Sequence, residues 1–272
     1  MLIGPAIGEF DYKDLKSAIE GFRVLELQPN DFLWNVYSAL DELSKVTFLS
    51  VHSVSKDIDL SSYDQEFRER SITATIKSMD MAHLVNADSL VLHPVNDMYL
   101  NPVERLEHAD VFLESFEKIM NHYNLSGHNY KLCIENIEYP KYPATLEETL
   151  DLQKKIPTTG IVIDIPHIWH SRDILRENPD YYREHSLGFP NGETLYQNLS
   201  QFIQENEHLI EEFHIAGFGH NPLRTHAPLY ERKNPIYNQL FTELIKKPII
   251  MEIYGQSKEQ ILLNEEIFRG LK

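Results

Sequence analysis

Short apolar runs recur along the chain and alternate with longer segments whose apolar residues are spaced as on a helix. The run GIVIDI at residues 160–165 is typical, because β-branched residues without polar alternation indicate a strand that is covered on both faces. Runs of this kind predict eight strands, at 2–8, 23–28, 47–53, 89–95, 131–137, 160–165, 211–217 and 248–254.

The segments between these runs favour helices. In segment 71–87, apolar side chains such as Ile72 and Met79 fall near one face of a helix. Thr145 and Glu148 have the spacing of a capping box, which predicts that a helix begins there. That helix covers residues 144–156, and the other predicted helices cover residues 196–209, 236–247 and 257–272.

Strands that alternate with helices over the whole chain predict an α/β fold, a single (β/α)8 TIM barrel formed by residues 1–272. A doubly wound open sheet is the alternative, but the chain contains no GxGxxG turn and no phosphate-binding loop motif. Residues 166–195 are too long for a plain connection, so we expect an elaborated loop or lid after the sixth strand.

Acids and imidazoles gather where the predicted strands end. Parallel barrels carry their chemistry at that face, which is built from the loops that follow the strands. The positions concerned are His52, His93, Glu135, Asp164, His167, His214 and Glu252, with His226 in the loop after the seventh strand.

A bound metal ion would explain this concentration of charge. Ionised Asp and Glu are almost never buried without a partner, and several carboxylates at one mouth repel one another unless a cation neutralises them. Mixed imidazole and carboxylate ligands suit manganese, zinc, iron or cobalt better than calcium, and we expect one or more such divalent ions per chain. The predicted ligands of the shared ion are Glu135, Asp164, His214 and Glu252.

Composition restricts the partners. The chain has 25 basic and 42 acidic residues and a formal net charge of −17, which disfavours nucleic acid and leaves a small molecule as the expected partner. No apolar run has the length of a membrane span, and the N-terminus lacks the pattern of a secretory signal. The lone Cys133 fits a reducing compartment, so a cytoplasmic protein is expected.

Seven stretches carry a family resemblance through their order and spacing: FRVLELQ, AHLVNADSLVLHPV, LCIENI, VIDIPHIW, EFHIAG, THAPLY and IIMEIY. The chain resembles the xylose isomerase-like TIM barrel superfamily, which includes sugar isomerases, sugar epimerases and endonuclease IV. The resemblance implies that the four predicted ligands hold one metal ion. It also implies that His167 contacts the substrate.

The resemblance implies a divalent-metal-dependent isomerase or epimerase of a sugar, sugar phosphate or polyol. The metal would stabilise the enediolate that forms when a proton leaves a carbon next to a carbonyl. Glu135 and Glu252 are the expected acid–base pair. The residues expected to contact a substrate phosphate or carboxylate are Arg224, Arg232 and Lys233.

Two relatives imply other reactions. Endonuclease IV is a phosphodiesterase with three zinc ions, and the resemblance to it would add His93, His167 and His226 as ligands. Arg224 in LRTH replaces an acid of that family. The stretches VHSVSKDIDLSS, FHIAGFG and THAP also resemble multinuclear non-haem iron oxidases that modify peptides.

In the oxidase alternative, His52, His93 and Glu135 would hold one iron. Asp164, His214 and Glu252 would hold a second iron, with Glu135 as the bridge. His167 and His226 would then be remnants of a third site. A barrel that binds a small ligand without catalysis is a further alternative, which the set of metal-type residues disfavours.

Several expectations concern the rest of the molecule. Glu26 is expected either at the barrel mouth or in a structural ion pair. Barrels of this group often form homo-oligomers through their outer helices, although the sequence shows no distinctive interface stripe. Histidines outside the strand ends, among them His83, His122 and His128, are expected to be ordinary surface residues.

Overall fold

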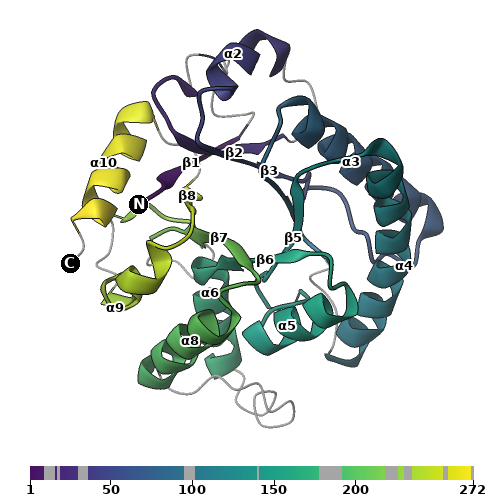
Figure 1. The fold of residues 1–272 in the computed structure, drawn as a ribbon. Coiled ribbons are helices and arrows are strands. Elements are labelled where there is room, and N and C mark those ends of the chain that lie inside the picture. Colours follow the sequence, from purple (N-terminus) through teal and green to yellow (C-terminus); the bar gives the residue numbers. More distant parts are fainter. Residues whose placement is uncertain are drawn as a thin grey trace.

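The predicted strands form a closed parallel barrel in the computed structural model, in chain order around the barrel (Figure 1). The strands are β1 (Ile3–Gly8), β2 (Val24–Gln28), β3 (Phe48–His52), β4 (Ser89–Leu92), β5 (Lys131–Glu135), β6 (Gly160–Asp164), β7 (Ile210–Ile215) and β8 (Ile249–Met251). The eight predicted strands are therefore confirmed, with ends that differ by a few residues.

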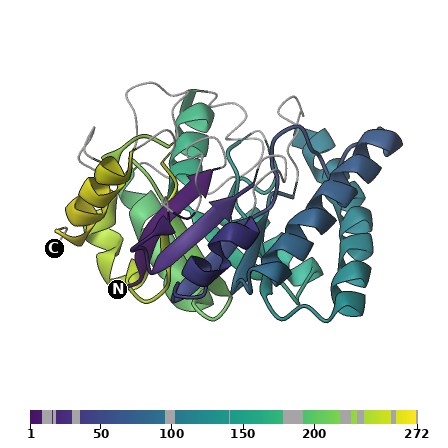
Figure 2. The same cartoon turned by 90° about the horizontal axis from the view of Figure 1, so that it is seen from above.

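The structure describes residues 1–8, 16, 19–29, 36–94, 102–139, 141–177, 192–217, 226–229, 235–253 and 257–270. Helices surround the barrel, as the view from above also shows (Figure 2). They are η1 (Val36–Ala39), α2 (Leu40–Leu43), α3 (Gln65–Leu84), α4 (Pro102–Ser126), α5 (Leu146–Lys155), α6 (Ile165–Glu177), α8 (Gly192–Asn206), α9 (Pro235–Leu244) and α10 (Lys258–Arg269).

The pairing of the first strand with the last closes the barrel and excludes the open sheet. Ile3 of β1 lies opposite Ile249 of β8 in a parallel pair, and Pro5 lies opposite Met251. Each of the other neighbouring strand pairs is parallel as well. All strands therefore end at the same face of the barrel, where a parallel barrel carries its site.

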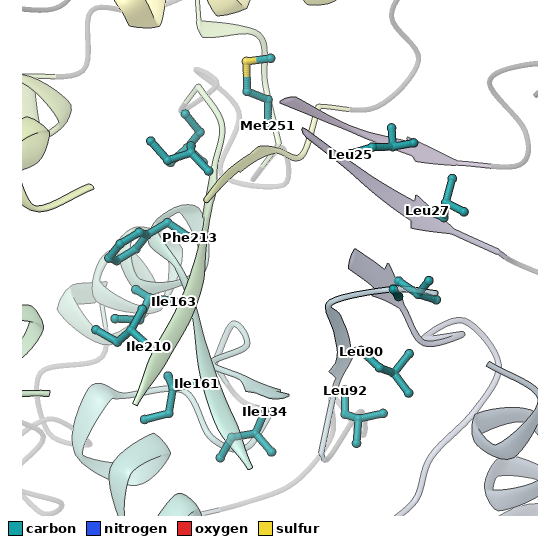
Figure 3. Packing of buried hydrophobic residues seen from close by; sticks show 14 of the residues in the cluster. Leu25, Leu27, Leu90, Leu92, Ile134, Ile161, Ile163, Ile210, Phe213 and Met251 are labelled. Carbon is teal, nitrogen blue, oxygen red and sulfur yellow. The ribbon is translucent and has the colours of Figure 1, made fainter. Parts of the chain in front are cut away.

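Alternation along each strand separates the packing of the core from the chemistry of the interior. Leu25 and Leu27 of β2 belong to the large apolar cluster, and Figure 3 shows them with members of that cluster from other strands of the barrel. Glu26, between them, is fully buried but hydrogen-bonds within the barrel. Since successive side chains point to opposite faces of a sheet, one strand serves both the helix layer and the interior.

Helix caps explain where the helices begin. The Thr145–Glu148 capping box is present as predicted, with the Glu148 N–H donating to Thr145 Oγ1 over 3.1 Å. Helix α3 begins at Gln65, before the predicted residue 71, because the Asp64 side chain accepts a hydrogen bond from the Phe67 N–H.

The elaborated segment after β6 differs from the expectation in its first part. Residues 165–177 form helix α6 instead of a loop, and residues 178–191 lie outside the described part of the chain. The Asp164 carboxylate accepts a hydrogen bond from the His167 N–H, as an N-cap residue does, and Pro166 stands early in the helix, where its missing N–H costs nothing. Ile165 and Ile168 bury this first turn in the core.

No helix in the described ranges is both long and apolar enough to cross a membrane.

The end of β7 is fixed to the outer layer by a buried tyrosine. The Tyr237 hydroxyl donates to the Ala216 carbonyl over 2.6 Å and accepts from the Ala216 N–H over 3.1 Å. The hydroxyl therefore satisfies both backbone groups two residues beyond His214.

We expect Tyr237→Phe to lower the free energy of unfolding by about 1–3 kcal/mol, because it leaves these buried groups without a partner. Urea denaturation measures the change. Tyr37→Phe is the control, since Tyr37 is 69% exposed and should tolerate the change. Equal stability of the two variants would show that the Tyr237 hydrogen bonds contribute nothing net.

Candidate metal centre at the barrel mouth

The strand ends bring acids and imidazoles to one mouth. His52, Glu135 and Asp164 are the last residues of β3, β5 and β6. His214 is the next-to-last residue of β7, and Glu252 directly follows β8. Because all strands are parallel, these five side chains lie at the same end of the barrel.

Three further predicted histidines lie at this mouth but outside the strands. His93 follows β4, His167 lies in the first turn of α6, and His226 belongs to the short described segment after β7. The predicted substrate contacts lie outside the described residues; they are Arg224, Arg232 and Lys233.

The four predicted ligands form a buried group, which we call the quartet: Glu135, Asp164, His214 and Glu252. Each offers one ligand atom, and these atoms all lie within 4.8 Å of one another. His214 Nδ1 is 3.1 Å from Glu135 Oε1 and 3.3 Å from Glu252 Oε2. The quartet can therefore surround one ion.

A second group shares Glu135 and lies at the ends of β3 to β5; we call it the β3–β5 group. Glu135 Oε2 is 3.2 Å from His52 Nε2 and 3.0 Å from His93 Nε2. The three ligand atoms lie within 4.8 Å of one another. The two oxygens of Glu135 thus face different imidazoles, as expected of a carboxylate that bridges two ions.

A third group shares Asp164 and lies at the start of α6; we call it the α6 group. It consists of Asp164, His167 and His226, again within 4.8 Å of one another. The Nε2 atoms of the two histidines are 3.2 Å apart. The structure therefore brings together every predicted site residue that it describes, in three groups that adjoin one another.

The carboxylates of the quartet differ in ionisation. Burial opposes ionisation of Glu135, but the charges of His214 and His93 outweigh this and hold its pKa well below the ordinary value. Burial raises the pKa of Asp164 well above its ordinary value, and the carboxylates of Glu135 and Glu252 raise it further. Without a metal, the mouth therefore does not accommodate the negative charge of all its carboxylates.

Burial and the neighbouring carboxylates also shift the pKa values of the histidines. Burial opposes protonation of His52, but its hydrogen bond to Glu135 and the charge of Glu26 raise its pKa to about 9. The pKa of His214 is raised as well, because the charges of Glu26 and Glu135 outweigh its burial. In contrast, burial lowers the pKa of His167 to about 4, so this ring is neutral at pH 7.

These residues fit a divalent metal ion. Among the described residues, none donates a hydrogen bond to the buried oxygen Oδ2 of Asp164. A buried polar atom without a partner is costly, and a cation beside it would remove that cost. The mixture of carboxylates and imidazoles suits zinc, manganese, iron or cobalt.

Two buried carboxylates lie below the quartet: Glu26, which was expected either at the mouth or in an ion pair, and Glu212, which was not predicted. Glu26 Oε2 is 3.2 Å from His214 Nε2, and Glu212 Oε1 is 3.9 Å from the same atom. Burial and the charge of Glu26 raise the pKa of Glu212 to about 8, so Glu212 is protonated at pH 7. The signal in the sequence was position: Glu212 precedes His214 by two residues and so points to the same face of β7.

Two side-chain amides hold the ligands in place. Asn136 donates to the Asp164 carbonyl over 2.8 Å and accepts from the Asp164 N–H over 2.9 Å. Gln28 donates to Glu26 over 3.0 Å and to Glu252 Oε1 over 2.9 Å. Such outer contacts orient metal ligands and increase the affinity of a metal site.

Comparison with known proteins agrees with this architecture. The sequence profile described as "Xylose isomerase-like TIM barrel" matches residues 18–253. Among curated proteins, no sequence matches. A D-tagatose 3-epimerase-like protein has a similar structure, with a TM-score of 0.72 and 17% sequence identity over 99% of this chain and 96% of that chain.

Two structures from Thermus thermophilus are also similar. Endonuclease IV matches with a TM-score of 0.68 and 16% identity, over 100% of this chain and 98% of that chain. The protein TTHB071, whose structure was obtained by soaking with ZnCl2, matches with a TM-score of 0.65 and 17% identity over the same shares. At these identities the likeness concerns the fold.

We expect Asn136→Ala to weaken zinc binding at the mouth by about 10–100-fold, because Asp164 loses both hydrogen bonds that fix its backbone. Competition with a zinc chelator measures the affinity. Asn124→Ala, at an exposed position of α4, is the control and should bind as the wild type does. An unchanged affinity in Asn136→Ala would contradict the positioning role.

Zinc affinity at the mouth should rise with pH up to about 9, because a proton on His52 competes with the metal below that pKa. Binding should therefore release protons at neutral pH. Calorimetry in buffers with different ionisation enthalpies measures this release. His52→Ala should release fewer protons than the wild type, and equal release by both proteins would contradict the assignment.

Proposed function

Because the chain belongs to the xylose isomerase-like TIM barrel family, we propose that it is an enzyme with a polynuclear metal centre that hydrolyses phosphate esters of small molecules. One observation carries the proposal: three ligand groups share one mouth, and Glu135 and Asp164 each belong to two of them. A site for one ion is complete with the quartet alone, which leaves His52 and His93 without a function.

The charge of the mouth favours an anionic substrate. One divalent ion in the quartet would not balance the negative charge of its three carboxylates, so the mouth would remain negative. An ion in each of the three groups would make the net charge of the mouth positive. A positive mouth attracts phosphate esters even in a chain with a net charge of −17. The same net charge disfavours a long nucleic acid as the substrate.

Metal ions bound in these groups would polarise the phosphoryl oxygens of the substrate and activate a water molecule. Glu135 would hold two neighbouring ions at a fixed spacing through its two oxygens. Glu138, which belongs to none of the groups, has an oxygen 3.3 Å from His167 Nε2. Burial opposes the ionisation of Glu138, but His167 and Lys141 lower its pKa to about 2. Glu138 is therefore too weak a base to accept a proton from the attacking water. Its contact with His167 gives it the role of positioning that ring.

A sugar isomerase or epimerase is the second candidate, because the quartet by itself can hold one ion and the epimerase-like neighbour shares the fold. We rank it second because of its acid–base pair. Both oxygens of Glu135 face imidazoles, and Oε1 of Glu252 accepts a hydrogen bond from Gln28. With these contacts, neither Glu135 nor Glu252 is well placed to take a proton from a carbon atom of a sugar or return it.

The iron oxidase alternative depends on the metal. His52, His93 and Glu135 are two histidines and one carboxylate, a set that iron(II) and zinc both accept. The identity of the metal that supports activity decides between the two.

The test combines a metal count with a substrate panel. Wild type and His93→Ala are loaded with zinc, manganese or, without oxygen, iron(II), and the bound metal is counted by mass spectrometry. Both are assayed on p-nitrophenyl phosphate, bis-p-nitrophenyl phosphate and a panel of aldoses and ketoses. We expect ester hydrolysis by the wild type, and the loss of one ion and of about 100-fold or more in rate in His93→Ala.

His208→Ala is the control, because His208 is exposed and lies outside the three groups. It should retain the metal and the activity of the wild type. Equal metal content in wild type and His93→Ala, together with interconversion of sugars, would replace the proposal by a mononuclear isomerase. Activity that requires iron and oxygen would favour the oxidase.

A further inference from the structure

Three imidazoles and a carboxylate meet on the outer wall of the barrel, at the end opposite the mouth. Asp80 and His83 lie near the end of α3, His122 lies near the end of α4, and His128 precedes β5. Helices α3 and α4 lie side by side (Figure 1), and both end before the strands that follow them begin. The histidines expected to be ordinary surface residues therefore form one cluster.

The distances match those of a metal site. His122 Nε2 is 3.1 Å from Asp80 Oδ1, and the ring centroids of His122 and His128 are 5.7 Å apart. One ligand atom from each of these three residues lies within 4.8 Å of the others. Two ligands of a tetrahedral zinc ion are about 3.4 Å apart, given zinc–nitrogen bonds of about 2.0–2.1 Å.

His128 is the unusual member of the cluster. Both of its ring nitrogens are shielded from solvent and have no hydrogen-bond partner within the described part of the chain. Partial burial and the neighbouring rings of His83 and His122 lower its pKa, so the ring is neutral, the form that binds metals. A shielded imidazole with neither nitrogen satisfied is costly, and a metal ion would satisfy one of them.

We propose that Asp80, His122 and His128 form a second metal site, separate from the mouth, for zinc or another transition metal that accepts imidazole ligands. Two nitrogen ligands exclude calcium and magnesium as the preferred ions. His83, whose ring centroid is 5.0 Å from that of His128, lies beside the site.

The site would act on stability. Its ligands come from the ends of two outer helices and from the segment that leads into β5. An ion bound there joins three parts of the chain, and an ion that binds only the folded chain stabilises it. The proposal does not depend on the reaction at the mouth.

Zinc titration of the full chain by calorimetry tests the site. Wild type and the control His208→Ala should bind the same number of ions. His122→Ala and His128→Ala should each bind one ion fewer, or bind that ion at least about tenfold more weakly. Both variants should keep the activity of the wild type, because the mouth is unchanged.

The same stoichiometry and affinities in all four proteins would overturn the site. Circular dichroism verifies that each variant is folded. His122 lies on a helix and is only partly buried, so alanine should be tolerated there. If a histidine variant is unfolded, Asp80→Asn gives the same test, because Asp80 is exposed and its carboxylate is removed without loss of volume.

Discussion

The structure depends on the burial of negative charge at the centre of a barrel. Glu135 is fully buried, and its two oxygens face three imidazoles from three other strands or strand ends. A buried carboxylate without a cation would cost several kcal/mol, so the fold must supply positive charge where the strands converge. Protonated histidines can supply part of it, and divalent metal ions can supply more. The raised pKa of Asp164 shows that the protein's own groups do not meet the whole demand.

The same strands build the core and the site, and this couples stability to chemistry. Outward residues such as Leu25 and Phe213 pack in the large apolar cluster, while inward residues such as Glu26 and His214 face the interior. A slip of one residue in any strand would expose its apolar side to the interior and move its ligand out of the mouth. The packing of the helices therefore holds in place the strands that carry most of the ligands, while helix α6 supplies His167 directly and is capped by Asp164.

The two ends of the barrel differ in what a metal would do there. At the mouth, the quartet is buried and shares carboxylates with the other two groups, so an ion changes the charge that a substrate meets. At the opposite end, Asp80 and His122 are reached by solvent and come from helices, so an ion would mainly join elements of the outer layer. The acidic composition of the chain increases the electrostatic benefit of a cation at either end.

The sequence by itself predicted the eight strands, the capping box at Thr145 and the residues of the quartet as candidates. Continuous apolar runs indicate buried strands, and the capping box is a local hydrogen-bond pattern, so both can be recognised from neighbouring residues. The sequence also indicated that acids would meet at one mouth, since parallel strands end together. The prediction of a barrel implied that the first strand pairs with the last, but it did not give the register of β1 against β8, because closure joins residues that are about as far apart as the chain allows.

Only the tertiary structure decided which candidate residues contact the same carboxylate. That Glu135 faces His52, His93 and His214 at once follows from the stagger of neighbouring strands, which no single segment specifies. Glu212 and Asn136 entered the site for the same reason. The helix at 165–177 was missed although its cap by Asp164 is local. The cluster around His128 was missed because it depends on the packing of α3 against α4, which brings Asp80 next to His122.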